Sequence, residues 1–355
     1  MKREGYKAAA GFVWFYFSSL FLMSGVSRSF VCTTYNILSS HLAGADHFPR
    51  CNAEDLKRRN RFPRILAHLE DSITQNAIIS LQEVPRMWSG PLHAFFQEKG
   101  YVMIDSLYGR FFNGYMGVAI AYNPQVFALQ DCKIFSVADS IKDKREKPLT
   151  TFIGSWVNWV SSFLPGQKEP PVDPWNKSRD RKNTSIFCRF RLKEDPEAPA
   201  FCVATYHMPC AFWCPPIMTI HVTELMKQTQ RLANGDRLVV NGDFNFMPDS
   251  PMYKLVTTGQ MDRSDAAYPP PNGNWTMEFK VMKSSYAVVL GKEPETTNFP
   301  GIESEFTGTL DYIFYSEGLK ARKCLPLPAE RELEFMPSAT QPSDHLLLQT
   351  TFDLQ

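Results

Sequence analysis

Short runs of β-branched and aromatic residues alternate with longer amphipathic segments along this chain, and that alternation restricts its fold more than any other feature. Runs with strand character cover residues 30–38, 77–82, 101–105, 117–122, 185–192, 201–207, 237–242 and 310–315, and most end at a polar residue. Apolar residues three or four positions apart predict helices over residues 63–73, 88–98 and 217–232, the first beginning at Pro63. Strands interleaved with helices that cover them predict an α/β or α+β fold.

The composition is that of a globular protein without a strong charge bias. The 355 residues, 44% of them apolar and 21% charged, can form one large domain or two modest ones. Lysine and arginine number 38 against 37 aspartates and glutamates, a net charge of +1. No overall field would draw the chain to nucleic acid, so a polyanionic substrate must be held by local basic patches.

Residues 1–27 have the pattern of a secretory leader. Lys2, Arg3 and Lys7 precede an uncharged apolar run over residues 8–23, and small residues follow it. A cleaved signal peptide is the favoured interpretation, an uncleaved membrane anchor is the second, and an organelle address is the third. We expect the protein in the secretory pathway or outside the cell, or held at a membrane by this segment, rather than in the cytosol or mitochondria.

The eight cysteines fit an oxidising compartment but are too few for a scaffold that depends on disulfides. Cys188 and Cys202 lie on predicted neighbouring strands, and Cys210 and Cys214 share one loop, so these are the two candidate pairs. Buried free thiols are an equal alternative. The sequence lacks the paired cysteine or histidine spacing of a zinc site.

The composition of the sequence changes between about residues 136 and 182, and we interpret this segment as an insertion into the main domain. A charged run is followed there by aromatic residues and then by prolines. Apolar side chains over residues 152–164 fall on one helical face and predict a short amphipathic helix. Packing onto the main core is the favoured role, and a substrate lid or a membrane-contacting element is the alternative.

An apolar strand delivers two polar side chains, Asp243 and Asn245, just past its end. Side chains two positions apart in an extended segment project to the same side. A carboxylate and an amide aimed at one point can orient a water molecule and bind a phosphate oxygen. Alone, such a pair is more often a turn cap, so its assignment to a catalytic site depends on other polar strand ends.

Five further strand or loop ends carry groups suited to metal binding or proton transfer. They are Asn36, Glu83, His207, Asp311 and the pair Asp344-His345. Carboxylate and amide oxygens are the ligands that hard cations prefer. Polar ends of this kind on so many strands predict one catalytic centre rather than a set of unrelated caps.

The order of these fragments resembles that of the endonuclease/exonuclease/phosphatase superfamily, which includes DNase I. The matching fragments are Tyr35-Asn36, Gln82-Glu83, Tyr206-His207, Gly242-Asp243-Phe244-Asn245, the Leu-Asp-Tyr-Ile run at 310–313 and the Ser-Asp-His run at 343–345. The resemblance runs from about Cys32 to Phe352 and implies a DNase I-like four-layer α/β/β/α sandwich of two mixed β-sheets over residues 30–355. The runs at 297–299 and 308–316 resemble the nocturnin and poly(A)-deadenylase branch. Members of that branch remove nucleotides from RNA 3′ ends or hydrolyse a 2′-phosphate or a 2′,5′ linkage.

The resemblance also implies a metal-dependent phosphoester hydrolase and a role for each acidic residue. Glu83 is the principal Mg²⁺ ligand, with Asn36 and Asp344 beside it, and Mn²⁺ is an alternative ion. Asp243 positions or deprotonates the attacking water. These roles are physically consistent, because a metal neutralises charge on the non-bridging oxygens while a carboxylate serves as the base.

The remaining residues are implied to act on the phosphate. Asn245 and His207 bind the scissile group, and His345, oriented by Asp311, stabilises or protonates the phosphorane oxygens. An imidazole supported by a carboxylate can remain cationic at neutral pH, as this role requires.

Two kinds of substrate fit this chemistry. The first is a nucleic acid, RNA in preference to DNA, cleaved by a nuclease of the 3′–5′ exoribonuclease type. Phe212, Trp213 and Trp275 could stack on bases, and the basic residues 57–59 could hold the backbone. The alternative is phosphatase or phospholipase-type hydrolysis of a small-molecule or lipid phosphoester, which the near-zero charge, the leader and the aromatic insertion favour. A monomer is expected, and a non-catalytic binding protein is disfavoured because no expected catalytic position is substituted.

Overall fold

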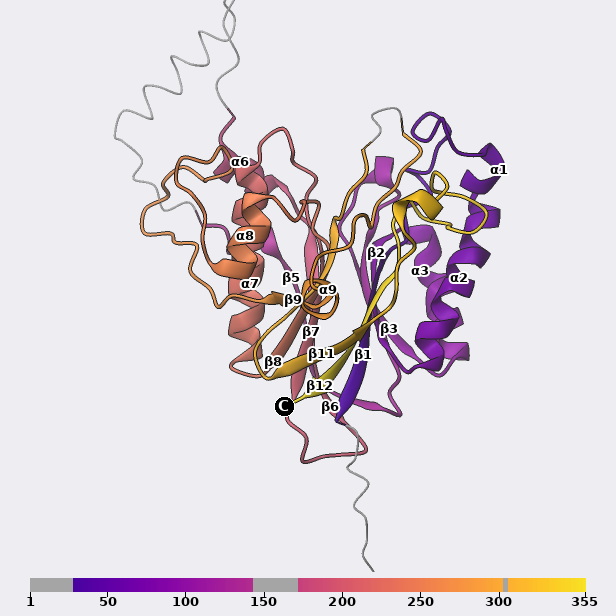
Figure 1. Ribbon diagram of the computed structural model, residues 1–355, viewed down its shortest axis with the longest axis horizontal. Helices are drawn as coiled ribbons and strands as arrows, with labels where there is room; N and C mark the ends of the chain where they lie inside the picture. The colour runs from indigo at the N-terminus through magenta and orange to yellow at the C-terminus, as the bar shows by residue number, and fades with distance from the viewer. Residues whose placement is uncertain (1–27, 143–171, 303–305) are drawn as a thin grey trace, which may run out of the picture.

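Two mixed β-sheets stack face to face in the computed structural model, which describes residues 28–142, 172–302 and 306–355. Each sheet has six strands, in the orders β11-β12-β1-β2-β4-β3 and β5-β6-β7-β8-β10-β9. Helices cover both outer surfaces (Figure 1). The predicted four-layer sandwich is therefore confirmed. The leader at 1–27 and the amphipathic helix predicted at 152–164 lie outside the described residues.

The first sheet carries the early part of the chain and its last described strand. Its strands are β1 (Ser29–Asn36), β2 (Ile78–Val84), β3 (Val102–Leu107), β4 (Gly117–Tyr122), β11 (Leu319–Cys324) and β12 (Leu348–Leu354). The short helix α1 (Ala53–Leu56) precedes α2 (Arg58–Thr74), and α2 and α3 (Arg86–Glu98) pack on the outer face. Strands β1 and β2 run parallel with Asn36 opposite Gln82, so Asn36 and Glu83 emerge side by side.

The second sheet places three predicted site residues in one row. Its strands are β5 (Phe127–Ser136), β6 (Thr184–Leu192), β7 (Phe201–His207), β8 (Arg237–Asp243), β9 (Lys283–Ser284) and β10 (Asp311–Tyr315). In the register of the sheet, Asp243 lies opposite His207 on one side and opposite Asp311 on the other. The helices of this half are α4 (Val137–Ser140), α6 (Pro174–Asp180), α7 (Pro216–Ala233), α8 (Pro251–Thr258) and α9 (Ser285–Leu290).

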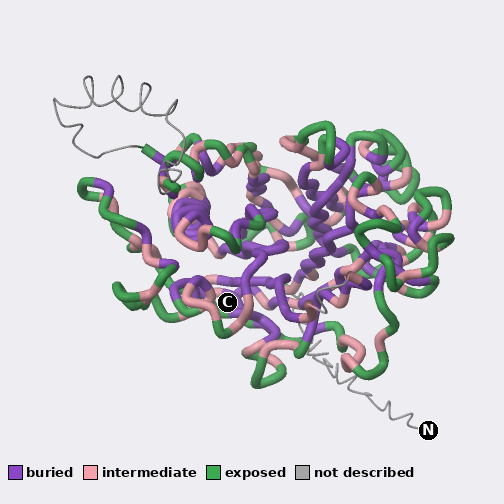
Figure 2. The backbone as a smooth tube through the Cα atoms, turned by 90° about the horizontal axis from the view of Figure 1, so that it is seen from above, coloured by how far each residue is buried: buried purple, intermediate pink, exposed green. Residues whose placement is uncertain are grey.

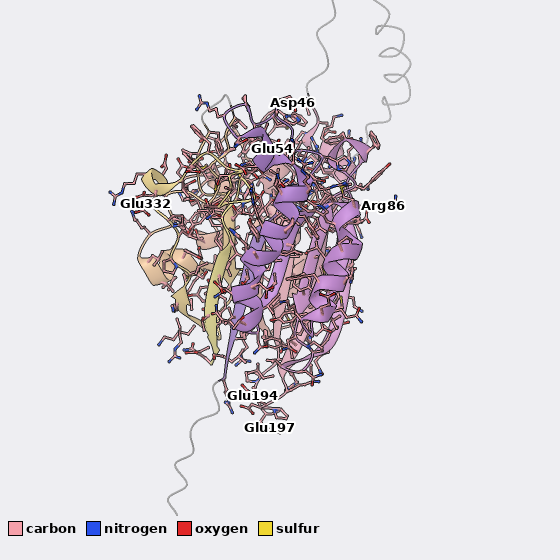
Figure 3. The ribbon with its side chains drawn as sticks, turned by 90° about the vertical axis from the view of Figure 1, so that its right-hand side faces the viewer. Asp46, Glu54, Arg86, Glu194, Glu197 and Glu332 are labelled. Carbon is pink, nitrogen blue, oxygen red and sulfur yellow. The ribbon has the colours of Figure 1, made fainter. Side chains whose placement is uncertain are left out.

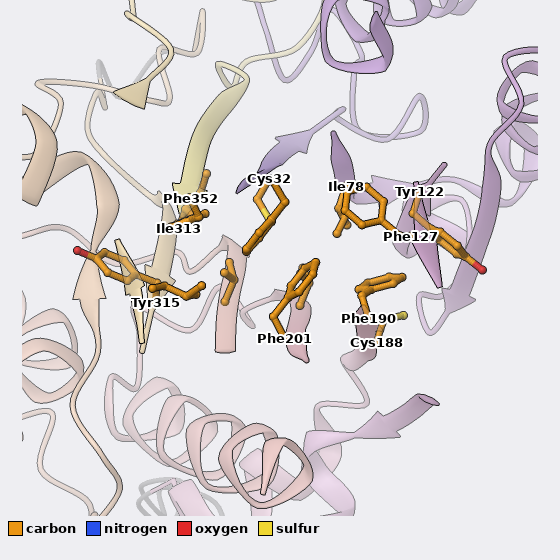
Figure 4. Packing of buried hydrophobic residues seen from close by; sticks show 14 of the residues in the cluster. Cys32, Ile78, Tyr122, Phe127, Cys188, Phe190, Phe201, Ile313, Tyr315 and Phe352 are labelled. Atoms are coloured by element: carbon orange, nitrogen blue, oxygen red, sulfur yellow. The ribbon is translucent and has the colours of Figure 1, made fainter. Parts of the chain in front are cut away.

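The main core fills the space between the two sheets. Aromatic and aliphatic side chains from both inner faces interdigitate there (Figure 4), and the rings of Phe30 and Phe201 stack with centroids 4.0 Å apart. Viewed from above, buried segments run through the middle of the molecule and exposed loops surround them (Figure 2). Burial of apolar surface, worth about 25 cal/mol per Å², holds the sheets together and fixes their strand ends relative to each other.

The two ends of the sandwich differ. Helices α1 and α6 lie at one end, and the C-terminus lies at the other (Figure 1). Arg86, which follows β2 closely, lies toward the same end as Asp46 and Glu54, whereas Glu194 and Glu197 of the β6–β7 loop mark the opposite end (Figure 3). None of the described helices is long and apolar enough to cross a bilayer.

The predicted start of one helix is wrong. Helix α2 begins at Arg58, so Pro63 lies inside it rather than in its first turn. The apolar spacing that predicted this helix starts only at Phe62. The first helical turn, at residues 58–61, is entirely polar, so that spacing could not indicate it. The extended backbone of Lys57 instead separates α2 from α1.

Neither candidate cysteine pair is joined, and all eight cysteines are free, so the alternative expectation of free thiols is confirmed. Strands β6 and β7 are neighbours as predicted, but Cys188 pairs with Val203 and Cys202 pairs with Arg189. Successive residues of a strand point to opposite faces, so a shift of one residue separates the two thiols. Cys188 instead lies with its Sγ 3.8 Å from that of Cys132 on β5.

Candidate active site

The predicted site residues come together at one end of the sandwich. A cleft of about 830 Å³ is lined there by Glu83, His207, Asp243, Asn245, Asp344 and His345. Asn36 and Asp311 lie beneath it, with 0% and 1% of their surface exposed. The structure therefore gathers all eight residues, from both sheets, around one cleft.

Asn36 joins the two sheets through its amide group. Its Nδ2 donates to Oδ2 of Asp243 at 3.0 Å and lies 3.3 Å from Oε1 of Glu83, while its Oδ1 accepts from the backbone of Leu38. The backbone of Ser39 donates to the second oxygen of Glu83 at 2.8 Å. Asn36 thus turns its nitrogen, not its oxygen, toward the carboxylates and holds them close together.

Backbone strain accompanies these contacts. Glu83 and Asn245 have φ angles of 57° and 52°, in the left-handed region that side chains other than glycine seldom adopt. Such conformations cost about 1–3 kcal/mol each and persist where the surrounding structure fixes them. Gly242 has φ 142°, and a Cβ there would lie 1.9 Å from the carbonyl oxygen of Tyr206. Only glycine fits where β8 delivers Asp243 to the cleft.

Asp243 and Asn245 form both a turn cap and a polar site. The backbone of Asn245 donates to Oδ1 of Asp243 at 2.8 Å, and the Asn245 amide donates to the carbonyl of Met208 at 3.0 Å. These bonds are those of a turn cap, the alternative role that we considered for this pair. Oδ2 of Asp243 still faces the cleft residues, so the cap does not exclude a role in the site. Capping fixes the rotamer of the carboxylate and so serves the site.

His345 and Asp311 form a buried hydrogen-bonded pair. Nδ1 of His345 lies 2.8 Å from Oδ2 of Asp311, which also accepts from the Thr297 hydroxyl at 2.7 Å. Nε2 of His345 is 3.7 Å from Oδ2 of Asp243. Burial opposes a charge on the ring, but the surrounding carboxylates, Asp311 foremost, outweigh it and hold the pKa of His345 well above its ordinary value. His345 is therefore a cation at neutral pH, with one N–H directed toward the cleft.

His207 occupies the opposite side of the Asp243 carboxylate. Its Nε2 lies 3.6 Å from Oδ2 of Asp243 and 4.0 Å from Oε1 of Glu83. The hydroxyl of Tyr108 lies 3.0 Å from Nδ1. When that hydroxyl donates to Nδ1, the ring proton resides on Nε2 and faces the cleft.

Two carboxylates of the site, Asp243 and Asp344, resist ionisation chiefly because they are buried. Burial raises the pKa of Asp243 to about 6; the neighbouring Asp311 adds to this, and the two imidazoles oppose it. Burial likewise raises the pKa of Asp344, and the Glu83 carboxylate contributes. A cluster of this kind favours either protons or a cation, and its donors on the cleft side are oxygens, which suit Mg²⁺ or Mn²⁺.

Two donor sets could hold a metal ion. Asp243, Asp311 and His345 each present a ligand atom, all within 4.8 Å of one another. However, the Nδ1 of His345 already faces Asp311 in a hydrogen bond. The carboxylates of Glu83 and Asp344, which line the cleft, remain available and are the better donors for a hard cation.

Some predicted substrate contacts are absent from the cleft. Phe212 and Trp213 line it, but Trp275 does not, because its Nε1 donates to Glu224 and its ring packs on Trp175 with centroids 4.8 Å apart. In the basic cluster at 57–59, Lys57 and Arg59 both pair with Glu54. The placement of Trp275 near the site is therefore wrong, and the basic cluster is no part of the cleft lining.

Three supporting residues were missed from the sequence. Tyr108 sits in a loop without a motif, and Arg61 lies on a helix whose charged residues look like a solvated face. Asn298 places its Nδ2 3.4 Å from Oδ2 of Asp344. The sequence does indicate this residue, because the run at 297–299 resembles the nocturnin and deadenylase branch. Its approach to Asp344 depends on the tertiary fold.

This fold and this site define a DNase I-like phosphoester hydrolase. The chain belongs to the Endonuclease/Exonuclease/phosphatase family, whose model matches residues 33–345. Among curated relatives, Carbon catabolite repressor protein 4 homolog 4 of Arabidopsis thaliana is 25% identical over 94% of this chain and 79% of its own length. Mouse 2′,5′-phosphodiesterase 12 is 31% identical over 41% of this chain, and Drosophila melanogaster Nocturnin is 29% identical over 49%. These last two matches span only 25% and 28% of the relatives' lengths.

Solved structures agree on the architecture. ANGEL2, a 2′,3′-cyclic phosphatase in complex with adenosine-2′,3′-vanadate, superposes with a TM-score of 0.71 at 23% identity, over 92% of this chain and 96% of that one. The human Nocturnin catalytic domain has a TM-score of 0.61 at 20% identity, over 93% and 96%. The chain thus lies near the nocturnin and CCR4 branch of the DNase I-like superfamily.

Proposed function

We propose that this protein is a Mg²⁺-dependent phosphodiesterase that shortens RNA from its 3′ end. The observation that carries the proposal is the position of Oδ2 of Asp243, between the imidazoles of His207 and His345 at 3.6 and 3.7 Å. A base flanked by two nitrogen donors, with Glu83 and Asp344 lining the same cleft, matches the demands of water attack on a phosphodiester.

The residues divide the reaction between them. Asp243 accepts a proton from the attacking water, and at neutral pH it is mostly ionised because its pKa is about 6. The cationic His345 holds a proton at Nε2, where it stabilises negative charge on the phosphoryl oxygens. His207, oriented by Tyr108, binds another of these oxygens.

The metal belongs on the carboxylate side of the cleft. Glu83 and Asp344 would hold it, with Asn36 fixing the position of Glu83. A bound Mg²⁺ supplies charge neutralisation for the non-bridging oxygens. The pKa values of Asp243 and Asp344, raised first by burial and further by a neighbouring carboxylate, support this assignment, because a bound cation would offset both costs of ionisation.

The names of the relatives support RNA as the substrate. One relative in Encephalitozoon cuniculi, 23% identical over 67% of this chain, is a probable CCR4-Not complex 3′-5′-exoribonuclease subunit. Nocturnin and 2′,5′-phosphodiesterase 12 stand in the same group of relatives. RNA therefore ranks above DNA, and small or lipid phosphoesters are the alternative.

A substrate panel tests the proposal. The full chain is incubated with 5′-labelled oligoadenylate, mixed RNA, DNA of the same sequence, a 2′,3′-cyclic nucleotide and phospholipid vesicles, with Mg²⁺ or with EDTA. We expect a ladder of 3′-shortened RNA with Mg²⁺ alone, and its loss in Glu83→Gln but not in the exposed control Glu98→Gln. Turnover confined to the cyclic nucleotide or to the vesicles would reject the RNA assignment.

A further inference from the structure

One lip of the cleft combines basic and aromatic side chains that the proposed chemistry does not use. They are Lys177, Arg181, Lys182, Phe212 and Trp213, which we call the α6 lip. The first three belong to α6 and the residues that follow it, and the last two to the loop after β7. All five line the same cleft as His207 and Asp243.

The cations of the α6 lip are available to a ligand. The guanidinium of Arg181 lies over the ring of Trp213, 5.7 Å from its centroid, and among the described residues it has no carboxylate at ion-pair distance. Lys182 pairs with Asp139 at 3.4 Å, but both side chains are more than half exposed, and such pairs contribute little. Within the described part of the chain, Asp180 lines the cleft on this lip and Asp139 lies beside Lys182, so two acidic groups face three basic ones. The local balance is positive, although the whole chain is near neutral.

The aromatic side chains are exposed although their loop is anchored. Phe212 and Trp213 are 54% and 55% exposed, whereas Met208 and Ala211 of the same loop are fully buried. Phe112, in the short 3-10 helix at residues 111–113, is 67% exposed and also lines the cleft. Large apolar groups held in water beside a catalytic cleft mark a surface that a ligand covers.

Buried contacts tie the α6 lip to the catalytic floor. The amide of Asn183 donates to the carbonyl of His207 at 2.8 Å. The buried ring of His221 bridges the carbonyl of Ser178 on α6, at 2.9 Å, and the hydroxyl of Tyr206 on β7, at 2.8 Å. The lip is therefore held in a fixed position relative to His207 and β7.

We propose that the α6 lip is a subsite for a nucleotide next to the scissile one in single-stranded RNA. Trp213 stacks on the base, and Lys177, Arg181 and Lys182 hold the flanking phosphate. The inference rests on the proposed function and adds that an efficient substrate carries a second phosphate and an unpaired base. Nucleic acid fits better than a lipid surface because the aromatic groups line a concave cleft around the catalytic residues, where a flat bilayer cannot reach.

Kinetics with substrates of two sizes test the subsite. The full chain is assayed with Mg²⁺ on a single-stranded oligoadenylate, on the same strand in a duplex, and on bis(p-nitrophenyl) phosphate, which has one phosphate only. The Arg181→Ala/Lys182→Ala variant should raise KM for the oligoadenylate roughly tenfold or more while leaving turnover of the small diester within about twofold. The slope of log kcat/KM against log salt should fall by about 0.7 for each lost phosphate contact.

The aromatic part of the subsite has its own variants. Trp213→Ala should raise KM for the oligoadenylate roughly fivefold or more, and Trp213→Phe should recover most of the loss, because any aromatic face can stack. Lys320→Ala/Lys323→Ala removes two exposed charges of β11, away from the cleft lining, and should behave as the unchanged protein. The duplex should be a poor substrate for every variant.

The outcomes separate the two proposals. If the unchanged protein cleaves neither RNA nor the small diester, the proposed function fails and the subsite with it. If it shortens RNA and the lip variants match it on every substrate, the subsite is rejected while the proposed function stands. Weaker vesicle binding by the lip variants, with unaltered RNA kinetics, would reassign this lip to a lipid surface and reject the inference.

Discussion

Asp243 is a carboxylate whose surroundings set the pH range of its chemistry. Its burial and the nearby Asp311 raise its pKa to about 6, and a proton acceptor works only when it is ionised. Below that pKa the carboxyl is protonated and cannot take a proton from water. The cationic His345 remains protonated across the same range because its pKa is raised well above the ordinary value.

We therefore expect activity to fall as pH decreases through about 6. The measurement is kcat/KM on bis(p-nitrophenyl) phosphate between pH 4.5 and 8, and each unit below the pKa should cost about tenfold. Asp243→Asn should be inactive throughout, since an amide cannot serve as the base. A profile that stays level down to pH 4.5 would contradict the role given to Asp243.

The residues to which we assign catalytic roles were accessible to sequence reasoning because the sheet itself positions them. His207, Asp243 and Asp311 close apolar runs, and strand register alone brings such ends together. Tyr108 and Arg61 were not accessible in this way, since a loop and a helix carry them to the site. No pattern in the sequence near Tyr108 or Arg61 indicates that the fold brings them to the site.

At the scale of secondary structure, the predicted strands all exist, and two of the strands that were not predicted, β12 and β5, lacked a sequence signal for different reasons. Strand β12 reads Leu-Gln-Thr-Thr-Phe-Asp-Leu, and its polar Gln349 and Thr350 are buried, where hydrogen bonds to Ser72 and Ser285 satisfy them. Strand β5 is half exposed along its length. Alternation of apolar and polar residues fails as a signal when polar residues face inward or when a strand lies at the edge of a sheet.

Helix α2 supports the site through one side chain. The fully buried guanidinium of Arg61 donates to the carbonyls of Pro342, Ile37 and Leu38 at 2.6, 2.7 and 2.8 Å. These carbonyls belong to the segments that carry Asn36 and Asp344. A planar group with several donors can satisfy all three, whereas an ammonium group on a thinner stem cannot reproduce that geometry.

We expect Arg61→Lys to lower both stability and turnover. Each buried carbonyl left without a donor costs about 1–3 kcal/mol, so the free energy of unfolding should fall by about 2–4 kcal/mol. Denaturant unfolding and kcat on the small diester measure the two effects. Arg58→Lys, the same change on the exposed face of the same helix, is the matched control, and equal unfolding midpoints for the two variants would show that Arg61 is not needed to hold these segments.

At the scale of the whole molecule, the site exists only when both sheets are stacked. Asn36 and Glu83 come from the first sheet, and Asp243 and Asp311 from the second. A cation held by Glu83 and Asp344 would relieve the repulsion between those two carboxylates in the folded protein. It would bind the folded protein and not the unfolded chain, and so shift the folding equilibrium.

Mg²⁺ should therefore raise the melting temperature of the full chain. A hundredfold excess over Kd corresponds to about 2.7 kcal/mol of added stability. Thermal unfolding with Mg²⁺ and with EDTA measures this, and Glu83→Gln should lose most of the increase while Glu98→Gln keeps it. An equal increase in both variants would place the ion elsewhere.

The pairing of β1 with β12 sets the order in which this enzyme can be completed. Phe30 lies opposite Phe352 in that pair, and Asp344 and His345 come just before β12 in the chain. During synthesis, this edge of β1 therefore stays unpaired until residues 348–354 have left the ribosome. Asp344 and His345 emerge just ahead of β12, so the cleft that they line stays incomplete until segments far apart in the sequence have been joined.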